Sequence, residues 1–177
     1  MLDYNAITSL VSIVGVTIAL AALALETRRE RLALQVDILM KLQDKWECFD
    51  MLKSREAAAK RLLASELVNY ELGDVLEFLA VIGFLYERKA IDTDLAYKEF
   101  SYWMIRYWLC AQSYVEQERR IDPQSWLTLE HIVEVMKKRE LKEGYPPYTQ
   151  DLLHAFLEEE ARMPPTMFKS KGRAGRA

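Results

Sequence analysis

The hydrophobic and polar positions divide the chain into one long apolar stretch followed by a series of shorter, periodic ones. Residues 6–25 carry no charged side chain, and residues 26–31 then supply five charges. An α-helix rises about 1.5 Å per residue, so about twenty residues cross the roughly 30 Å hydrocarbon core of a bilayer. The pattern predicts a transmembrane helix over 6–25, preceded by a short external tail at 1–5.

The charges beside this stretch predict its orientation. Arg28, Arg29 and Arg31 follow it, whereas Asp3 is the only charged side chain before it. Lys and Arg near a span favour its cytoplasmic side. We therefore expect a single-pass protein of the inner (plasma) membrane, with its N-terminus outside and its C-terminus in the cytoplasm. A cleavable signal peptide fits less well, because its basic residues precede an apolar run of only about 7–15 residues.

The rest of the chain shows helical periodicity and no strand-like alternation. Apolar residues at steps of three and four from Leu32 to Phe49 predict that the first helix continues as an amphipathic rod. Ser54 is expected to cap a helix over 55–63, and Asp74 with Glu77 resembles a capping box. The fold class is therefore all-α, a transmembrane helix continuing into an amphipathic helix and then a cytoplasmic helical bundle.

Further signals mark the later helices. Asp92 or Thr93 is expected to cap a long helix that ends near residue 116, and Pro123 to occupy the first position of the next. Gly144 is typical of the residue after a helix end. Thr149 or Asp151 then begins a last short helix. These signals define a cytoplasmic helical domain at 26–162 and a basic, disordered tail at 163–177.

Charge narrows the classes of partner. The domain at 26–162 holds 20 Lys and Arg against 26 Asp and Glu, so its net charge is −6. A nucleic-acid-binding domain normally presents a basic face, and therefore no nucleic acid is expected as a partner. Cys48 and Cys110 lie far apart in the chain among apolar neighbours, which favours reduced, buried thiols.

Short motifs follow the predicted span along residues 6–135, at 28–31, 75–79, Gly83, 91–92, Phe100, 107–108, Arg119, Trp126 and Glu130. Together they resemble an uncharacterised bacterial family, a domain of unknown function found in short membrane-anchored proteins. Members tend to carry an acid shortly before the glycine that corresponds to Gly83, where this chain has Ala80. The resemblance implies membrane attachment and an all-helical fold, and it implies no activity.

No motif of a known catalytic or cofactor-binding class occurs. His131 and Glu134 form an i, i+3 pair, but a di-iron bundle of the ferritin type needs two Glu-x-x-His motifs. We therefore expect no metal, no cofactor and no enzymatic activity.

Arg106 is the most unusual charged residue, because it lies within the aromatic sequence 102–108. On a helix it shares a face with Glu99 and Tyr102, which favours an ordinary surface pair. The alternative is a semi-buried ion pair with Glu77 or Glu87 from another helix, since a buried arginine without a partner is costly.

Small residues line one face of the predicted span at steps of four and three. Small faces let transmembrane helices approach closely, so this face is a candidate for self-association. A dimeric coiled coil could continue it through Ala33, Val36 and Met40. The face consists of Thr8, Ser12, Gly15, Ala19 and Ala22.

Two functions remain open. The first is a membrane-anchored helical interaction module that contacts lipid and binds itself or other proteins. The alternative is an oligomeric membrane effector that perturbs the bilayer when its cytoplasmic domain is triggered. Overexpression discriminates between them, because an effector would dissipate the membrane potential.

Overall fold

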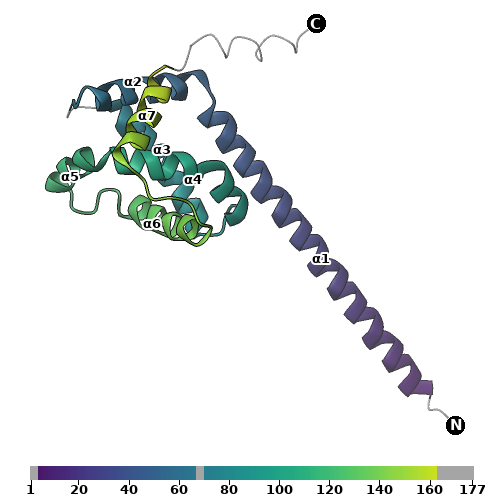
Figure 1. The fold of residues 1–177 in the computed structure, drawn as a ribbon. Coiled ribbons are helices and arrows are strands. Elements are labelled where there is room, and N and C mark those ends of the chain that lie inside the picture. The colour runs from purple at the N-terminus through teal and green to yellow at the C-terminus, as the bar shows by residue number, and fades with distance from the viewer. Residues whose placement is uncertain (1–3, 67–69, 163–177) are drawn as a thin grey trace, which may run out of the picture.

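The computed structural model describes residues 4–66 and 70–162, with side chains from residue 15 onward (Figure 1). This part of the chain contains only helices and no strand, which confirms the all-α class. The helices are α1 (Tyr4–Trp46), α2 (Phe49–Leu63), α3 (Tyr70–Glu87), α4 (Thr93–Cys110), α5 (Gln112–Ile121), α6 (Leu127–Lys142) and α7 (Gln150–Ala161).

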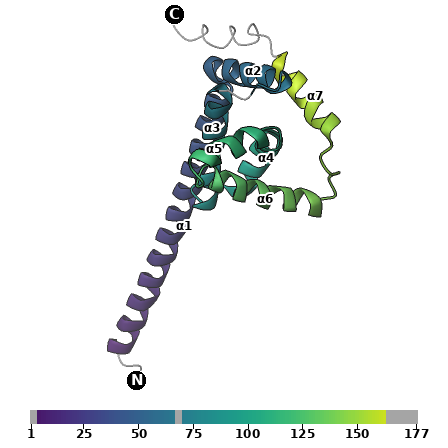
Figure 2. The same cartoon turned by 90° about the vertical axis from the view of Figure 1, so that its left-hand side faces the viewer.

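Helix α1 is one continuous rod of 43 residues, as the sequence predicts. Most of its length projects away from the body (Figures 1 and 2). Only its C-terminal part is anchored, because Leu39 and Trp46 are buried among the other helices while Leu32 and Leu34 stay exposed. Trp46 therefore acts as the main apolar attachment of the rod.

No helix within the described residues is long and apolar enough to cross a membrane. The described side chains of α1 offer an uncharged run of only eleven residues, 15–25, before Glu26 and the arginines. Residues 6–14, the first part of the predicted span, lie outside the described side chains. The predicted transmembrane helix is thus not supported by the described part of the chain.

The core of the body forms where α3 packs against α2, α4 and α6. Helix α3 is apolar on nearly all sides, so it can be covered from several directions at once. Helix α7 lies across α2 and also touches α4, and a loop joins it to α6, which precedes it in sequence (Figure 2). The large side chains buried in this core include Leu72, Leu76, Leu79, Ile82, Phe100, Met104, Ile105, Tyr107, Leu129 and Ile132.

Three of the predicted helix ends are confirmed. Asp92 accepts hydrogen bonds from the backbone N–H groups of Asp94 and Leu95, at 3.0 and 2.8 Å. Gly144 has φ +84° directly after α6, the left-handed conformation that a side chain would strain. Thr149 caps α7 by accepting from the N–H of Leu152 at 3.3 Å.

Three other predicted helix starts are wrong. Ser54 lies inside α2, which begins at Phe49, and Asp74 lies inside α3, which begins at Tyr70. Pro123 lies in a turn, and α6 begins only at Leu127, after Trp126 with φ 68°. Buried Leu52 precedes Ser54 and buried Leu72 precedes Asp74, so the apolar face of each helix already begins before the capping-type residue. The turn that contains Pro123 ends at the left-handed Trp126, and α6 begins only after it.

The long helix predicted after Asp92 is divided in two. Ala111 ends α4, and its N–H bonds to both Tyr107 O and Trp108 O, at 2.9 and 3.3 Å. Helix α5 then leaves in a new direction. The predicted tail at 163–177 lies outside the described residues.

Candidate functional site

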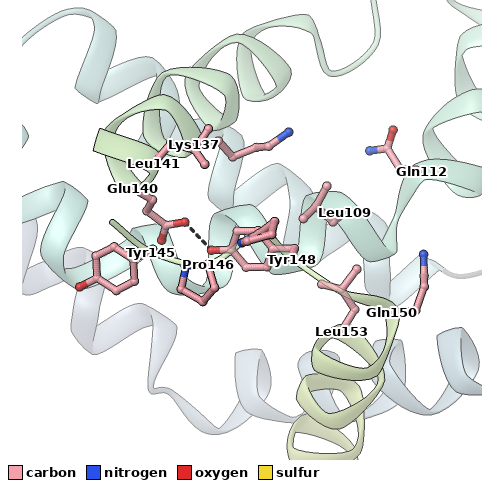
Figure 3. Close-up of a pocket in the computed structure, with 11 residues that line it drawn as sticks. Leu109, Gln112, Lys137, Glu140, Leu141, Tyr145, Pro146, Tyr148, Gln150 and Leu153 are labelled. Atoms are coloured by element: carbon pink, nitrogen blue, oxygen red, sulfur yellow. Dashed lines mark hydrogen bonds between the residues drawn. The ribbon is translucent and has the colours of Figure 1, made fainter. Parts of the chain in front are cut away.

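The loop formed by residues 145–149, which joins α6 to α7, has a cleft on each side. The first cleft has a volume of about 410 Å³ and lies between α4, α6 and the start of α7 (Figure 3). Leu109, Leu141 and Leu153 form apolar parts of its wall, while Lys137 and Gln112 stand at its polar rim. This combination of apolar wall and few polar groups is typical of binding clefts.

Tyr148 fixes the loop to α6. Its hydroxyl donates a hydrogen bond to Glu140 Oε2 at 2.6 Å, the dashed line in Figure 3. Burial, followed by this bond to Glu140, raises the pKa of Tyr148 well above its usual value. The backbone N–H of Tyr145 also bonds to Glu140 O, at 3.1 Å. The loop is therefore held at both ends, and the clefts beside it have a defined shape.

The second cleft, of about 500 Å³, lies on the other side of the loop and contains Arg106. The guanidinium carbon of Arg106 is 3.6 Å from the ring centre of Tyr102 and 5.2 Å from that of Tyr148. Its Nη1 donates to Tyr102 O at 3.0 Å. Arg106 is thus a partly buried cation within cation–π distance of two aromatic rings.

A second arginine of this cleft, Arg139, pairs with two acids. It pairs with Asp94 at 2.8 Å and with Glu143 at 2.9 Å. The hydroxyl of Tyr97 donates to Glu143 at 3.0 Å. Burial and then Glu143 raise the pKa of Tyr97 to about 12, while hydrogen bonding to Arg139 lowers the pKa of Glu143.

The structure brings neither Glu77 nor Glu87 to Arg106. Glu77 lines a separate cleft between α1, α2 and α3, and Glu87 lies 3.8 Å from His131 Nε2. Across residues 15–66 and 70–162, no carboxylate lies within 4.0 Å of the Arg106 guanidinium. Its observed partner is Tyr102 of its own helix, one of the two residues that its helical face predicts.

A fully buried ion pair, which the sequence did not predict, joins Arg55 of α2 to Glu160 of α7. Arg55 Nε and Nη2 donate to the two oxygens of Glu160 at 2.8 and 2.6 Å, and Tyr107 also donates to Glu160. Both charged side chains are only 4% exposed. The guanidinium lies over Trp46, 4.2 Å from a ring centre. An arginine and a glutamate 105 residues apart give no local sequence signal of such a pair.

The small residues and the arginines of α1 lie away from the body. Gly15 has open space where a Cβ would lie, and Ala19 and Ala22 are exposed. Thr8 and Ser12 lie outside the described side chains. Arg28, Arg29 and Arg31 are exposed as well. The predicted association face is therefore unobstructed over its described positions.

Metal-ligating residues do not cluster in the described ranges, where no group of three or more His, Cys, Asp and Glu side chains is placed to hold an ion. His131 and His154 are exposed and each lies near a single glutamate, Glu87 and Glu158 respectively.

Comparison with known proteins places the chain in a family. No curated protein and no solved structure matches it. A family model described as Domain of unknown function (DUF4760) matches residues 9–136, which run from α1 into α6. The 145–149 loop and Glu160 lie beyond the matched range. Because this match covers more than half of the sequence, the chain belongs to this family, as its resemblance to an uncharacterised family implied.

Proposed function

We propose that this protein is a membrane-anchored interaction module, with residues 6–25 in the bilayer and the helical body in the cytoplasm. The observation that carries the proposal is the exposure of α1. Val16, Ile18, Leu20, Leu23 and Leu25 are between 59% and 65% exposed. At 3.6 residues per turn, Val16, Leu20 and Leu23 face one side and Ile18 and Leu25 the opposite side. One docking partner on one face would leave the other face in water.

A bilayer would cover all sides at once. Burying an exposed Val, Leu or Ile side chain contributes about 1.5–3 kcal/mol, so these residues alone favour an apolar environment strongly. The uncharged sequence continues toward the N-terminus through residue 6. The three arginines after Leu25 support the orientation, because basic residues favour the cytoplasmic side.

The features of the helical body favour a role in binding over a role in catalysis. The apolar cleft beside the 145–149 loop offers a preformed surface for a partner, and the acidic charge of 26–162 favours proteins over nucleic acids. The strongest polar cluster, around Glu160, is closed within the core. We therefore assign the protein no catalytic step and no cofactor.

Extraction of membranes with alkaline carbonate tests the anchor. The full chain is expected to stay in the membrane pellet, because a transmembrane helix is not released by removing surface charge. The double variant V16R/L20R should move to the soluble fraction, since each arginine at the centre of a span costs about 2.5–3.5 kcal/mol. The matched variant L32R/L34R, beyond the predicted span, should remain in the pellet. Release of the wild-type chain would contradict the anchor.

Two fusions test the orientation. Alkaline phosphatase joined after residue 60 should be inactive, and green fluorescent protein at the same point should fluoresce, because the first folds only outside the cytoplasm. High phosphatase activity would reverse the topology.

Self-association of the span tests whether the protein binds itself. Gly15→Leu should weaken dimerisation in a membrane two-hybrid assay, while Val14→Leu, on another face, should not. Equal signals would exclude this face. Loss of membrane potential on overexpression would favour the alternative, a bilayer-perturbing effector.

A further inference from the structure

Arg106 has hydrogen-bonding capacity that its own chain does not use. A guanidinium carries five N–H donors in a planar fork, and the hydrogen bond from Nη1 to Tyr102 O uses one of them. This oxygen belongs to the preceding turn of the same helix, so the bond fixes the side chain along α4 without neutralising it. Arg106 lines the second cleft, so its other four N–H donors are those that a ligand in this cleft could use.

The nearby acids are already engaged. Glu143 pairs with Arg139 and accepts from Tyr97, and Glu140 accepts from Tyr148. Neither lies within 4.0 Å of Arg106, and Glu140 is buried. An exposed lysine, Lys98, adds a further positive charge to the lining. The cleft thus contains a cation that no carboxylate of the described residues approaches within 4.0 Å.

The rings of Tyr102 and Tyr148 limit the directions from which an anion can reach the Arg106 guanidinium. The guanidinium carbon lies 3.6 Å from the ring centre of Tyr102 and 5.2 Å from that of Tyr148, so ring contacts use the face of the group and the N–H edge is the side that can bind an anion. A planar group that accepts two parallel hydrogen bonds matches that edge. Tyr145, Pro146 and Leu152 line the same cleft and provide apolar contact for the remainder of a ligand.

The surrounding charge favours a monoanion. Glu140 and Glu143 line the cleft, and the Tyr102 hydroxyl interacts with Glu159. The charged residues that line the cleft are three cations, Lys98, Arg106 and Arg139, and the two acids Glu140 and Glu143, so a single negative charge balances the lining. A carboxylate also matches the planar fork better than a tetrahedral phosphate does.

We propose that this cleft binds an organic carboxylate, held by the edge of Arg106 beside Tyr102 and Tyr148. The inference rests on the proposed binding role of the body and does not depend on the membrane anchor. The carboxylate belongs either to a free small acid or to the C-terminus of a peptide, since both present the same group.

Fluorine NMR on the full chain in detergent micelles tests the proposal. The probe is 4-fluorophenylacetate at pH 7, and its neutral amide is the matched control, with empty micelles as the baseline. The acid should be broadened by the protein and the amide should not. Arg106→Gln should weaken binding about tenfold or more, because a hydrogen bond to a charged group contributes about 1.5–3 kcal/mol. Arg106→Lys, which keeps the charge and loses the fork, should give an intermediate affinity.

Matched controls separate binding from folding. Arg162→Gln removes an exposed arginine that pairs with Glu158 at the end of α7, and it should leave binding unchanged. Circular dichroism checks that each variant is folded. If Arg106→Gln does not fold, the loss of affinity in Arg106→Lys decides the role of the fork.

The source of the carboxylate is resolved by a second probe. Acetyl-Gly-Gly-4-fluorophenylalanine is compared with its C-terminal amide, and tighter binding than 4-fluorophenylacetate identifies a peptide terminus. Equal binding of acid and amide, unchanged affinity in Arg106→Gln, or tighter binding of 4-fluorophenyl phosphate would overturn the proposal. Carbonate extraction reports separately on the anchor, so the two failures are distinguishable.

Discussion

Arg55 and Arg106 both lie against aromatic rings, but only Arg55 is paired with a carboxylate of the described residues. Each guanidinium lies against an aromatic ring, Trp46 for Arg55 and Tyr102 for Arg106. Arg55 is 4% exposed and forms a two-pronged pair with Glu160. Arg106 lines an open cleft and has no carboxylate among the described residues within 4.0 Å.

The difference shows that burial decides whether a cation needs a carboxylate partner from the same protein. A charge removed from water has to be paired, because an isolated buried charge is strongly unfavourable. Helix α7 supplies that partner to Arg55 and in doing so is fixed against α2. Arg106 remains in contact with water, so its hydrogen-bonding edge can stay available to a ligand.

The largest expected change in the free energy of unfolding comes from breaking the buried Arg55–Glu160 pair. Glu160→Ala should lower the free energy of unfolding by about 3–5 kcal/mol, because it leaves Arg55 buried and uncompensated. Denaturant unfolding of the full chain in micelles measures it. The triple variant R55M/Y107F/E160L should recover most of the loss, since apolar side chains of similar volume can replace a buried pair and no buried hydroxyl is then left without an acceptor. A triple variant as unstable as Glu160→Ala would show that the cause is not the unpaired charge.

A smaller effect is expected from the third member of the buried cluster. Tyr107→Phe removes the hydroxyl that donates to Glu160 and leaves the ion pair and the ring in place. The free energy of unfolding should fall by about 1.5–3 kcal/mol, the range for a hydrogen bond to a charged group. Tyr102→Phe, at an exposed position of the same helix, serves as the control and should change stability less.

Removing Arg106, which has no carboxylate partner among the described residues, should affect stability least. Arg106→Gln should lower the free energy of unfolding by no more than about 1 kcal/mol, since it removes a cation–π contact at a partly exposed site. The same denaturation experiment gives the comparison with Glu160→Ala. A loss as large as that of Glu160→Ala would mean that Arg106 is structural, which would argue against its role in binding.

The finest test uses Cys110, which lies near Arg106. Burial raises the pKa of the Cys110 thiol to about 12, and the charge of Arg106 partly opposes this rise. Only the thiolate reacts with iodoacetamide, so the partly buried Cys110 should react slowly at pH 8. Cys48 is exposed, so the expectation of a buried thiol was wrong at this position, and it serves as an internal control. Arg106→Gln should slow Cys110 further by a few-fold, because the pKa rises when the cation is lost. Mass spectrometry of timed samples measures both rates, and faster alkylation of Cys110 in the variant would contradict this.

Local sequence signals predicted the part of the fold that short-range forces control. Asp92, Gly144 and Thr149 mark helix ends correctly, because a cap or a left-handed residue acts within one turn of the backbone. Ser54 and Asp74 carry the same chemistry and failed, since the apolar faces around them continue into the preceding turn. The aromatic sequence around Arg106 pointed to an unusual cation, and the choice of partner could not be made from α4 alone.

The sequence by itself determined the all-helical class, the continuous rod of α1 and the uncharged stretch at 6–25, because periodicity and charge are properties of neighbouring residues. Only the tertiary structure decided which charged side chains are buried in ion pairs and which line a cleft without a carboxylate partner. Arg55 meets Glu160 across 105 residues, and Arg106 meets Tyr148 through a loop that folds back from α6. Such contacts depend on how α7 packs across α2, which is set by the combined burial of many side chains rather than by any local pattern.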